Sequence, residues 1–387
     1  MDRSKERNKG KKKKKARSTF TNALTTVKPK MAVEKSFSDL CYDGEVNENG
    51  ARHGFGILDV HPYFTYEGEF SNNLKHGRGK ITLVGGDCYV GYFENDKMSG
   101  HGTLTWRNGD IYQGEFQNGN IQGKGVKYFL ESGDKLEGSW SNSLCEGWAI
   151  KNFACGDIYE GYYENDERNG YGTYTWSDGS SYRGYWLNGC PYGRGIKTFC
   201  RSMGKYDGEW KDGEANGYGI RIFGNGDSHE GHYEHDARDG YGCYHWTNGD
   251  RFEGQWVNGQ MCGSGVKQHA NGDIFEGQWN HDKAHGSGTK IFHNGDIHVG
   301  EYRSDNRHGR GLYQYSNGDE FEGRWENGYQ SGPGIYRYAS TGETFEGFWE
   351  LGKMHGSGYL KTLDQNIFLE IWNMGVRTYR SEIVPEG

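Results

Sequence analysis

Apolar and polar side chains alternate in short runs along most of this chain. Within residues 112–116, for example, two aromatic residues and a glycine alternate with a glutamine and a glutamate. Because residues i, i+2 and i+4 of a strand share one face, such a run is expected to be a strand with one aromatic face. No window carries an apolar stripe at helical spacing, so helix is a poor alternative. The pattern predicts an all-β protein.

An aromatic-x-Gly-x-aromatic motif recurs at steps of 23 or 24 residues. Its central glycines are Gly44, Gly68, Gly91, Gly114, Gly138, Gly161, Gly184, Gly208, Gly231, Gly254, Gly277, Gly300, Gly323 and Gly347. A fifteenth, degenerate copy has Glu370 in place of the glycine. Nine residues after the central glycine, or ten in the first copy, comes a Gly-x-Gly pair, and the fifth copy departs by reading GWA at residues 147–149. A turn such as Asn-Gly-Asp at residues 108–110 then follows.

These signals predict two short strands in each copy. Asn-Gly between two alternating runs is a strong hairpin signal, and neighbouring hairpins are expected to stack as an antiparallel sheet. The glycines on the packed face are expected to leave room for the aromatic rings. One hairpin alone is marginally stable, whereas an array in which each hairpin contacts the next can be stable as a whole. The expected fold is a single-layer antiparallel β-hairpin repeat array.

Residues 182–189 (YRGYWLNG) and 252–259 (FEGQWVNG) closely resemble the MORN repeat, named for membrane occupation and recognition nexus. The resemblance covers about residues 42–375, with about 14 full repeats and one degenerate copy, and it implies an elongated, twisted strip of hairpins. The predicted organisation is a disordered polybasic tail at residues 1–38, a repeat array at 39–375 and a C-terminal cap or tail at 376–387.

A longer period is superimposed on the repeats. Residues 94–119, 164–189 and 234–259 align at a spacing of 70, and residues 303–328 follow at a spacing of 69. Three repeats therefore make one superunit, and four superunits run from about residue 89 to residue 358. Two interpretations stay open: tandem duplication of a three-repeat block, or an equivalent binding surface on every third hairpin, suited to a repeated partner.

Composition favours a thin aromatic core. Gly accounts for 65 of the 387 residues and aromatic residues for 15%, while hydrophobic residues total only 33%, so a deep aliphatic core is not expected. With only 5 Pro, the chain is neither collagen-like nor a Pro-rich linker.

Charge separates the N-terminus from the rest of the chain. Residues 1–35 contain 13 Lys and Arg against 3 Asp and Glu, a net charge of +10, so the rest must carry −18 to give the total of −8. Such a basic run is expected to be disordered. Its candidate contacts to an anionic surface are Lys9, Lys11, Lys12, Lys13, Lys14, Lys15 and Arg17. A nuclear-import-like or merely solubilising tail is the open alternative.

The acidic array limits the partners that can be expected. It should repel polyanions, so no nucleic acid is expected on the repeat body. The family resemblance implies phosphoinositide binding, which is expected to act mainly through the basic tail.

Sequence features of catalysis and of metal binding are missing. There is no phosphate-binding GxxxxGK[ST] loop, no nucleophile elbow and no CxxC pair among the 8 Cys. His229, His232 and His235 alternate between the packed face, the outer face and a turn, so they are not expected to converge on one metal ion. We predict no enzyme activity, no cofactor and no metal. No apolar stretch is long enough to span a bilayer and no secretory signal is evident, so a cytoplasmic location is expected.

Outward-facing aromatic positions are the candidate partner-binding residues. His101, Tyr171 and Tyr241 stand at the same position of successive superunits, and Tyr185 also faces outward. The predicted function is a non-enzymatic scaffold for protein assemblies, which the resemblance places at the cytoskeleton, the cell cortex or the ciliary axoneme. Residues 47–56 are similar to the opening repeat of radial-spoke-head members of the family. A peripheral phospholipid-binding module is the alternative, and the unpaired terminal strands make homo-oligomers a further expectation.

Overall fold

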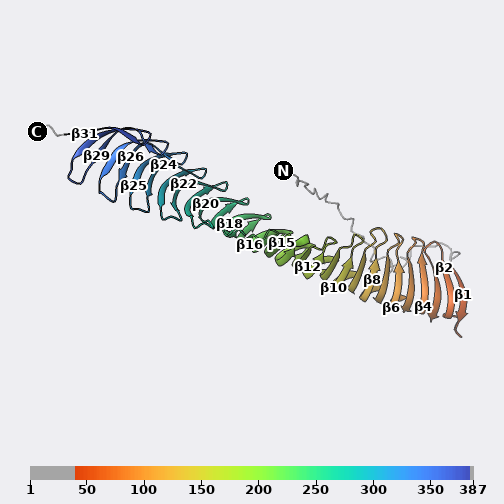
Figure 1. The fold of residues 1–387 in the computed structure, drawn as a ribbon. Helices are drawn as coiled ribbons and strands as arrows, with labels where there is room; N and C mark the ends of the chain where they lie inside the picture. The colour runs from red at the N-terminus through yellow and green to blue at the C-terminus, as the bar shows by residue number, and fades with distance from the viewer. Residues whose placement is uncertain (1–39, 384–387) are drawn as a thin grey trace. The chain divides into compact units, whose positions relative to one another are not determined.

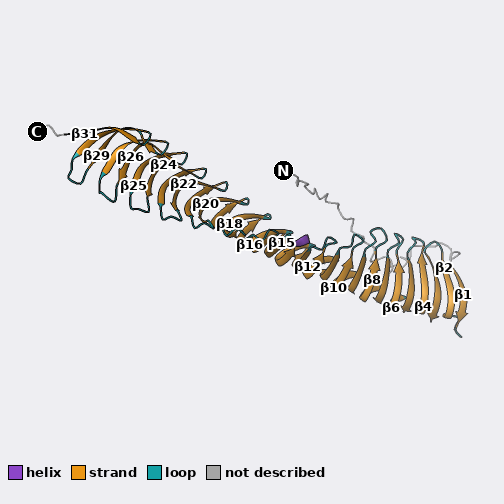
Figure 2. Ribbon diagram, in the orientation of Figure 1, coloured by secondary structure: helices purple, strands orange, loops and turns teal. Residues whose placement is uncertain are grey.

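The computed structural model describes residues 40–383. The predicted tail, with all seven of its candidate basic residues, lies outside the described residues. Within residues 40–383 nearly all regular structure is β-strand, and one 3-10 turn, η1 (Cys200–Ser202), interrupts it (Figure 2). The all-β prediction is confirmed.

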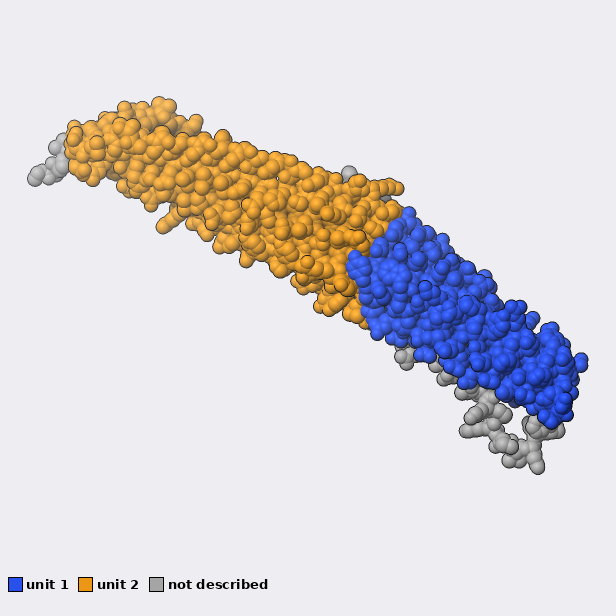
Figure 3. Space-filling model, turned by 90° about the horizontal axis from the view of Figure 1, so that it is seen from below, with its two compact units in different colours: residues 1–177 blue, residues 178–387 orange. Residues whose placement is uncertain are grey.

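The chain divides into two compact units, residues 1–177 and residues 178–387 (Figure 3). In the described part of unit 1 the strands are β1 (Leu40–Val46), β2 (Arg52–Val60), β3 (Phe64–Ser71), β4 (Leu74–Leu83), β5 (Cys88–Glu94), β6 (Lys97–Thr105), β7 (Ile111–Gln117), β8 (Asn120–Tyr128), β9 (Lys135–Ser141), β10 (Leu144–Asn152), β11 (Ile158–Glu164) and β12 (Glu167–Thr175).

In the described part of unit 2 they are β13 (Ser181–Leu187), β14 (Cys190–Thr198), β15 (Gly204–Lys211), β16 (Glu214–Phe223), β17 (Ser228–Glu234), β18 (Ala237–His245), β19 (Arg251–Val257), β20 (Gln260–Gln268), β21 (Ile274–Asn280), β22 (Lys283–Ile291), β23 (Ile297–Arg303), β24 (Asn306–Gln314), β25 (Glu320–Glu326), β26 (Tyr329–Arg337), β27 (Thr344–Glu350), β28 (Lys353–Met354), β29 (Gly356–Lys361), β30 (Ile367–Asn373) and β31 (Val376–Ile383).

Within each unit, consecutive strands pair antiparallel in chain order, so each repeat is one hairpin (Figure 1). The exception is β27, which pairs with both β28 and β29 because the return strand of that hairpin is interrupted. The degenerate last copy also forms a hairpin, in which β31 pairs with β30 as far as Ile383, past the predicted array boundary at residue 375. The predicted array of antiparallel hairpins is confirmed.

Two kinds of turn recur between the strands. Between β3 and β4, Asn72 and Asn73 both have positive φ (49° and 70°), as in the tight two-residue hairpin turns that match the twist of the strands. Between β6 and β7, the Trp106 amide donates to the Asp110 carbonyl and Gly109 closes the loop with a φ of 86°. The predicted Asn-Gly-Asp turn is therefore the second kind of turn.

The core of each unit is a ladder of aromatic rings on one face of the sheet. The Tyr66 ring packs edge-on against Phe70 of its own strand, with centroids 5.0 Å apart, and against Phe93 of the next repeat at 5.1 Å. Tyr89 continues the zigzag by contacting Phe93 at 5.2 Å and Phe116 at 4.8 Å. Each such pair contributes about 0.5–1.5 kcal/mol beyond its buried area, so the ladder couples every hairpin to the next.

The glycine pairs make this ladder possible. Gly68 on β3 lies directly opposite Gly79 on β4, and the Tyr66 ring covers both. The prediction that glycines leave room for rings is confirmed for the central glycine and for the second glycine of the Gly-x-Gly pair. In the fifth copy Leu136 replaces the covering ring, and Ala149 replaces the glycine opposite Gly138. In this copy a smaller covering side chain, Leu136, is therefore matched by a larger residue beneath it, Ala149.

The first glycine of each Gly-x-Gly pair has a different role, which the sequence did not predict. Gly77 has a φ of +67°, and the strand register shifts between Gly68 and Phe70 on the partner strand. This is a β-bulge, which bends the return strand and needs a residue that tolerates left-handed backbone.

Candidate interaction face

The face opposite the ring ladder is called the outer face. On β7, Tyr112 and Phe116 are buried in the ladder, whereas Gln113 is exposed and Glu115 is half-buried on the opposite side. The alternation predicted for residues 112–116 is confirmed. Since the ladder side chains are buried against one another, a partner would contact the side chains of the outer face.

A groove of about 770 Å³ lies on the outer face of unit 1, across β6 to β10. Gly102, Gly114, Gly125 and Gly138 contribute to its lining. The longer side chains that line it are His101, Gln113, Glu115, Lys124, Glu137 and Trp148. The glycines contribute backbone between these side chains, and the side chains give the groove charges of both signs and an aromatic ring.

Trp148 extends the aromatic surface beyond the groove. It lies opposite Tyr162 of β11, with the ring centroids 5.4 Å apart and the planes nearly perpendicular. Trp148 is 44% exposed and Tyr162 is 50% exposed, unlike the aromatic rings of the ladder. A buried aromatic pair would be explained by folding, but an exposed one marks a surface that a partner could cover.

The four predicted partner-binding residues all lie on the outer face, and the structure does not place them in one site. His101 on β6 lines the groove, and Tyr171 lies on β12 of the same unit. Tyr185 on β13 and Tyr241 on β18 belong to unit 2. Of the four, only His101 shares a lining with Trp148.

Sequence reasoning missed Trp148 and Tyr162. The signal was present, because Trp148 holds the variable middle position of the motif in the fifth copy, the outward position that Tyr171 holds in the next copy.

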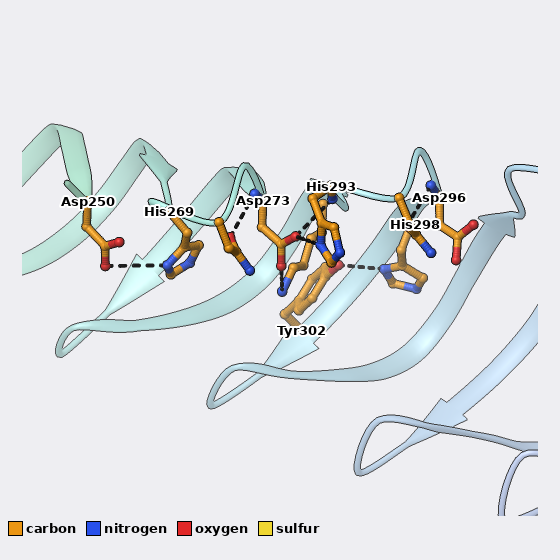
Figure 4. A network of polar contacts seen from close by, with 10 residues as sticks. Asp250, His269, Asp273, His293, Asp296, His298 and Tyr302 are labelled. Atoms are coloured by element: carbon orange, nitrogen blue, oxygen red, sulfur yellow. Dashed lines mark hydrogen bonds and ion pairs between the residues drawn. The ribbon is translucent and has the colours of Figure 1, made fainter. Parts of the chain in front are cut away.

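Acidic side chains at the loop edge link successive repeats, as Figure 4 shows for part of unit 2. Asp273 accepts hydrogen bonds from the backbone amide of His293 at 2.9 Å and from its Nδ1 at 3.1 Å. Lys290 Nζ lies 3.3 Å from the second carboxylate oxygen. Burial acts to raise the pKa of Asp273, but the bonds from His293 and Lys290 hold it at about 2. In the preceding repeat, Asp250 stands 3.5 Å from His269.

The same hydrogen bond, from a backbone amide to an aspartate of the preceding loop, recurs in both units. The aspartates that accept an amide of the following loop are Asp87, Asp110, Asp134, Asp157, Asp227, Asp250, Asp273, Asp296 and Asp319. Each carboxylate is thus a hydrogen-bonded structural link between repeats, which explains the Asp of the Asn-Gly-Asp turn.

The three histidines of the HEGHYEH run lie where the sequence predicted. His229 is fully buried at the ladder position usually held by Tyr or Phe, His232 is exposed, and His235 stands in a turn with a φ of 49°. The Nδ1 atom of His229 lies 2.8 Å from the Tyr233 hydroxyl. His298 repeats this arrangement with Tyr302 at 2.7 Å (Figure 4). Among residues 40–383 no group of three or more His, Cys, Asp or Glu side chains is arranged to hold a metal ion.

Arginines packed between rings recur at the superunit spacing in unit 2. The Arg238 guanidinium lies 4.2 Å from the Trp256 centroid and 4.8 Å from that of Tyr244. Arg307, 69 residues later, lies 4.2 Å from the Trp325 ring. Arg238 and Arg307, which recur with the longer period, therefore pack on the face of the ring ladder.

The fold and this open face define a class of protein, a β-hairpin repeat array with an exposed interaction surface. The chain belongs to the MORN-repeat family. The family model for the MORN repeat matches residues 42–59, 66–88, 89–111, 112–129, 159–181, 206–228, 229–251, 252–274, 275–297, 298–320, 321–342 and 345–361, more than half of the chain. It does not match residues 130–158 or 182–205, where the structure nevertheless has the hairpins β9–β10 and β13–β14.

No curated protein matches this chain. Two solved structures show a weak likeness. One is the SAS-4 (dCPAP) TCP domain of Drosophila melanogaster in complex with a proline-rich motif of Ana2 (dSTIL), at 13% identity over 46% of this chain and 85% of that chain, with a TM-score of 0.19. The other is a streptogramin B lyase, at 14% identity over 87% of this chain and 96% of that chain, with a TM-score of 0.13. At these TM-scores neither likeness supports an inference about this chain.

MORN repeats often take part in protein or membrane interactions, and an all-β repeat array is typical of a non-enzymatic interaction module. Within residues 40–383, no helix has the length and apolar character that crossing a membrane requires.

Proposed function

We propose that this protein is a non-enzymatic scaffold that organises protein assemblies at the cytoskeleton, the cell cortex or the ciliary axoneme. The observation that carries the proposal is the groove of about 770 Å³ on the outer face of unit 1, bounded by His101 and Trp148 among others. Trp148 of this lining forms an exposed pair with Tyr162 beside the groove, and such a pair is the kind of aromatic anchor that dominates protein interfaces. Glu115, Glu137 and Lys124 supply the polar surroundings that would orient a partner.

Proximity labelling in the native cell tests this proposal, because it reports location and neighbours together. A double variant, W148A with Y162A, is expected to lose a defined set of labelled proteins. The matched control is F348A, which removes an outer-face aromatic that is 53% exposed on β27 of unit 2. If the double variant and the control label the same proteins as the wild type, the groove is not the binding surface.

The predicted residues Tyr171, Tyr185 and Tyr241 extend this proposal to a repeated partner. His101, Tyr171 and Tyr241 recur at the superunit spacing, so a polymeric partner would contact the array at several equivalent places. Binding through several linked contacts gives avidity that falls stepwise as contacts are removed. Alanine at one, two and three of these positions is expected to lower the apparent affinity in graded steps. If one substitution alone caused most of the loss of affinity, the hypothesis of a repeated binding surface would be contradicted.

A second candidate function is peripheral binding to phospholipid, with a phosphoinositide-containing membrane as the target. The observation that favours it is the division of charge, +10 in residues 1–35 against −18 in the rest. Each basic residue near an anionic surface contributes about 1 kcal/mol, whereas the acidic array is repelled. Pelleting with anionic vesicles is expected to require residues 1–35. Equal pelleting after their deletion would assign lipid binding to the array.

A further inference from the structure

The outer face of β18 and β19 in unit 2 holds a cysteine between two nitrogen groups. Cys243 Sγ lies 3.3 Å from Nε2 of His245, two residues further along the same strand. Arg251 on β19 donates from Nε to the same sulfur at 3.1 Å. A cation and a hydrogen-bond donor beside a sulfur stabilise negative charge on it, which is the environment of reactive cysteines.

The arginine is itself held in place. Its Nη2 pairs with the Glu253 carboxylate at 2.6 Å, and the Tyr241 hydroxyl donates to the other oxygen of that carboxylate at 2.9 Å. This leaves Nε of Arg251 directed at Cys243. The hydrogen bond to the Cys243 sulfur is also the largest of the causes that raise the pKa of Arg251.

Carboxylates stand on both neighbouring strands, and Glu253 of β19 lies directly opposite Cys243. Glu230 of β17 stands opposite Cys243 in the sheet, and its charge alone would disfavour a thiolate. One of its oxygens accepts a hydrogen bond from the Tyr218 hydroxyl at 2.6 Å. The groups within hydrogen-bond distance of the sulfur are His245 and Arg251.

The repeat fold does not require this cluster. In the superunit 70 residues earlier, the positions of Cys243, His245 and Arg251 are taken by Thr173, Thr175 and Ser181. That copy forms the same strands without a thiol, an imidazole or a guanidinium at these positions. The aligned residues also provide substitutions that the fold already accepts.

Other cysteines of the chain have contrasting surroundings. Cys145 is fully buried, and burial raises the pKa of its thiol to about 12. Cys155 interacts with the carboxylate of Asp157, where a thiolate would be repelled. Cys190 is exposed at the start of β14 and serves as an internal reference for an accessible thiol.

We propose that Cys243 is a nucleophilic thiol and a modification site for small electrophiles, with peroxides as the oxidants it would meet in a cell. In the reaction with hydrogen peroxide, Nε2 of His245 takes the thiol proton and the sulfur attacks one peroxide oxygen. The S–O bond forms as the O–O bond breaks, and the leaving hydroxide takes the proton to become water. The sulfur is oxidised by two electrons to a sulfenic acid, and the peroxide is reduced to water. This inference does not rest on the proposed scaffold function.

Limited alkylation of the full-length native chain tests the nucleophile. Iodoacetamide is added at neutral pH, and mass spectrometry of the peptides gives the rate for each cysteine. Cys243 is expected to react roughly tenfold faster than Cys190. The R251S and H245T variants are each expected to lower the Cys243 rate and to leave the Cys190 rate unchanged. A Cys243 rate no higher than that of Cys190, or a rate that neither variant alters, would overturn the proposal.

Two further arms separate reactivity from folding and test the oxidant. Circular dichroism shows whether each variant keeps the wild-type strand content, and in urea the cysteines are expected to react alike. A second sample is treated with hydrogen peroxide and trapped with dimedone, which should label Cys243 before Cys190. Preferential alkylation of Cys243 without a dimedone adduct there would support the nucleophilic thiol and refute its reaction with peroxide.

Discussion

The ring of Tyr66 on β3 lies directly over Gly79 on β4 and leaves no room there for a β-carbon. The Tyr66 hydroxyl reaches past the glycine pair to donate to the Glu69 carbonyl at 2.9 Å. In this hairpin one aromatic ring therefore covers the glycine of the return strand, and the same ring contacts the next repeat through Phe93.

Substituting Gly79 by Ala is expected to destabilise unit 1, because the new methyl group must displace the Tyr66 ring or the strand beneath it. Overpacking of this kind costs about 1–3 kcal/mol. The measurement is the urea midpoint followed by far-ultraviolet circular dichroism. Gly85→Ala is the matched control, since a β-carbon at Gly85 meets nothing within 4 Å. Equal midpoints for the two variants would show that the ring does not need the glycine.

Gly147→Ala tests the other role of glycine, the left-handed backbone of the bulge. Gly147 has a φ of +78°, and the nearest atom to an added β-carbon is Cβ of Ser139 at 3.9 Å. Space is available, so the expected loss of about 1–2 kcal/mol comes from backbone conformation alone. Gly147→Asn should lose less than the alanine variant, because Asn tolerates this region better. Equal losses for both variants in urea unfolding would indicate a packing effect instead.

Much of the fold could be predicted because its signals are local. The alternation within residues 112–116 and the Asn-Gly turns fixed the strands, and the glycine spacing indicated which positions lie under rings. The bulge at Gly77 could not be predicted in this way, because it arises from register. Both glycines of a pair look alike in sequence, but Gly79 faces a ring and Gly77 bends the strand.

The candidate site could be predicted only in part. His101 was predicted because it stands at an outward position that recurs at the superunit spacing. Trp148 was not predicted, because no Trp recurs at that position in the other superunits. The groove depends on side chains from five strands, β6 to β10. Its shape therefore follows from how successive strands curve and twist, which no single repeat specifies.

The buried histidines are expected to make unit 2 sensitive to mild acid. Burial is the largest cause that lowers the pKa of both His229 and His298 to about 3, well below the value near 6.5 of an unfolded histidine. Below about pH 6.5 the unfolded chain therefore binds protons that the folded chain does not. Stability should fall between about pH 6.5 and pH 3, by at most about 1.4 kcal/mol per pH unit for each histidine.

The double variant H229Y with H298Y isolates this effect. It recreates the Tyr159–Tyr163 pair that unit 1 already contains at the same ladder positions. Urea midpoints at pH 7 and pH 5 should differ less in the variant than in the wild type. The aspartates with lowered pKa lose their contribution only below about pH 3.8, so they do not contribute to a difference between pH 7 and pH 5. An unchanged pH dependence would mean that the histidines stay neutral in the unfolded chain or become solvated in the folded one.

Glu370 is expected to fasten the last hairpin of the array. It replaces a ladder glycine, is only 1% exposed, and accepts hydrogen bonds from Arg377 at 2.8 Å and from Nε1 of Trp372 at 3.1 Å. Glu370→Gln removes the charge that Arg377 pairs with, at a local cost of about 2 kcal/mol, below the range for fully buried pairs because Arg377 is 43% exposed.

Hydrogen exchange followed by mass spectrometry measures where this loss falls. In a repeat array each hairpin is stabilised by its neighbours, so E370Q should speed exchange in residues 367–383 and leave residues 274–303 unchanged. The matched control is Glu350→Gln, the same substitution at a side chain that is 57% exposed. Faster exchange throughout unit 2 would show that the terminal hairpin stabilises the whole unit cooperatively. No change in residues 367–383 would show that the buried ion pair contributes nothing net, because its desolvation offsets its attraction.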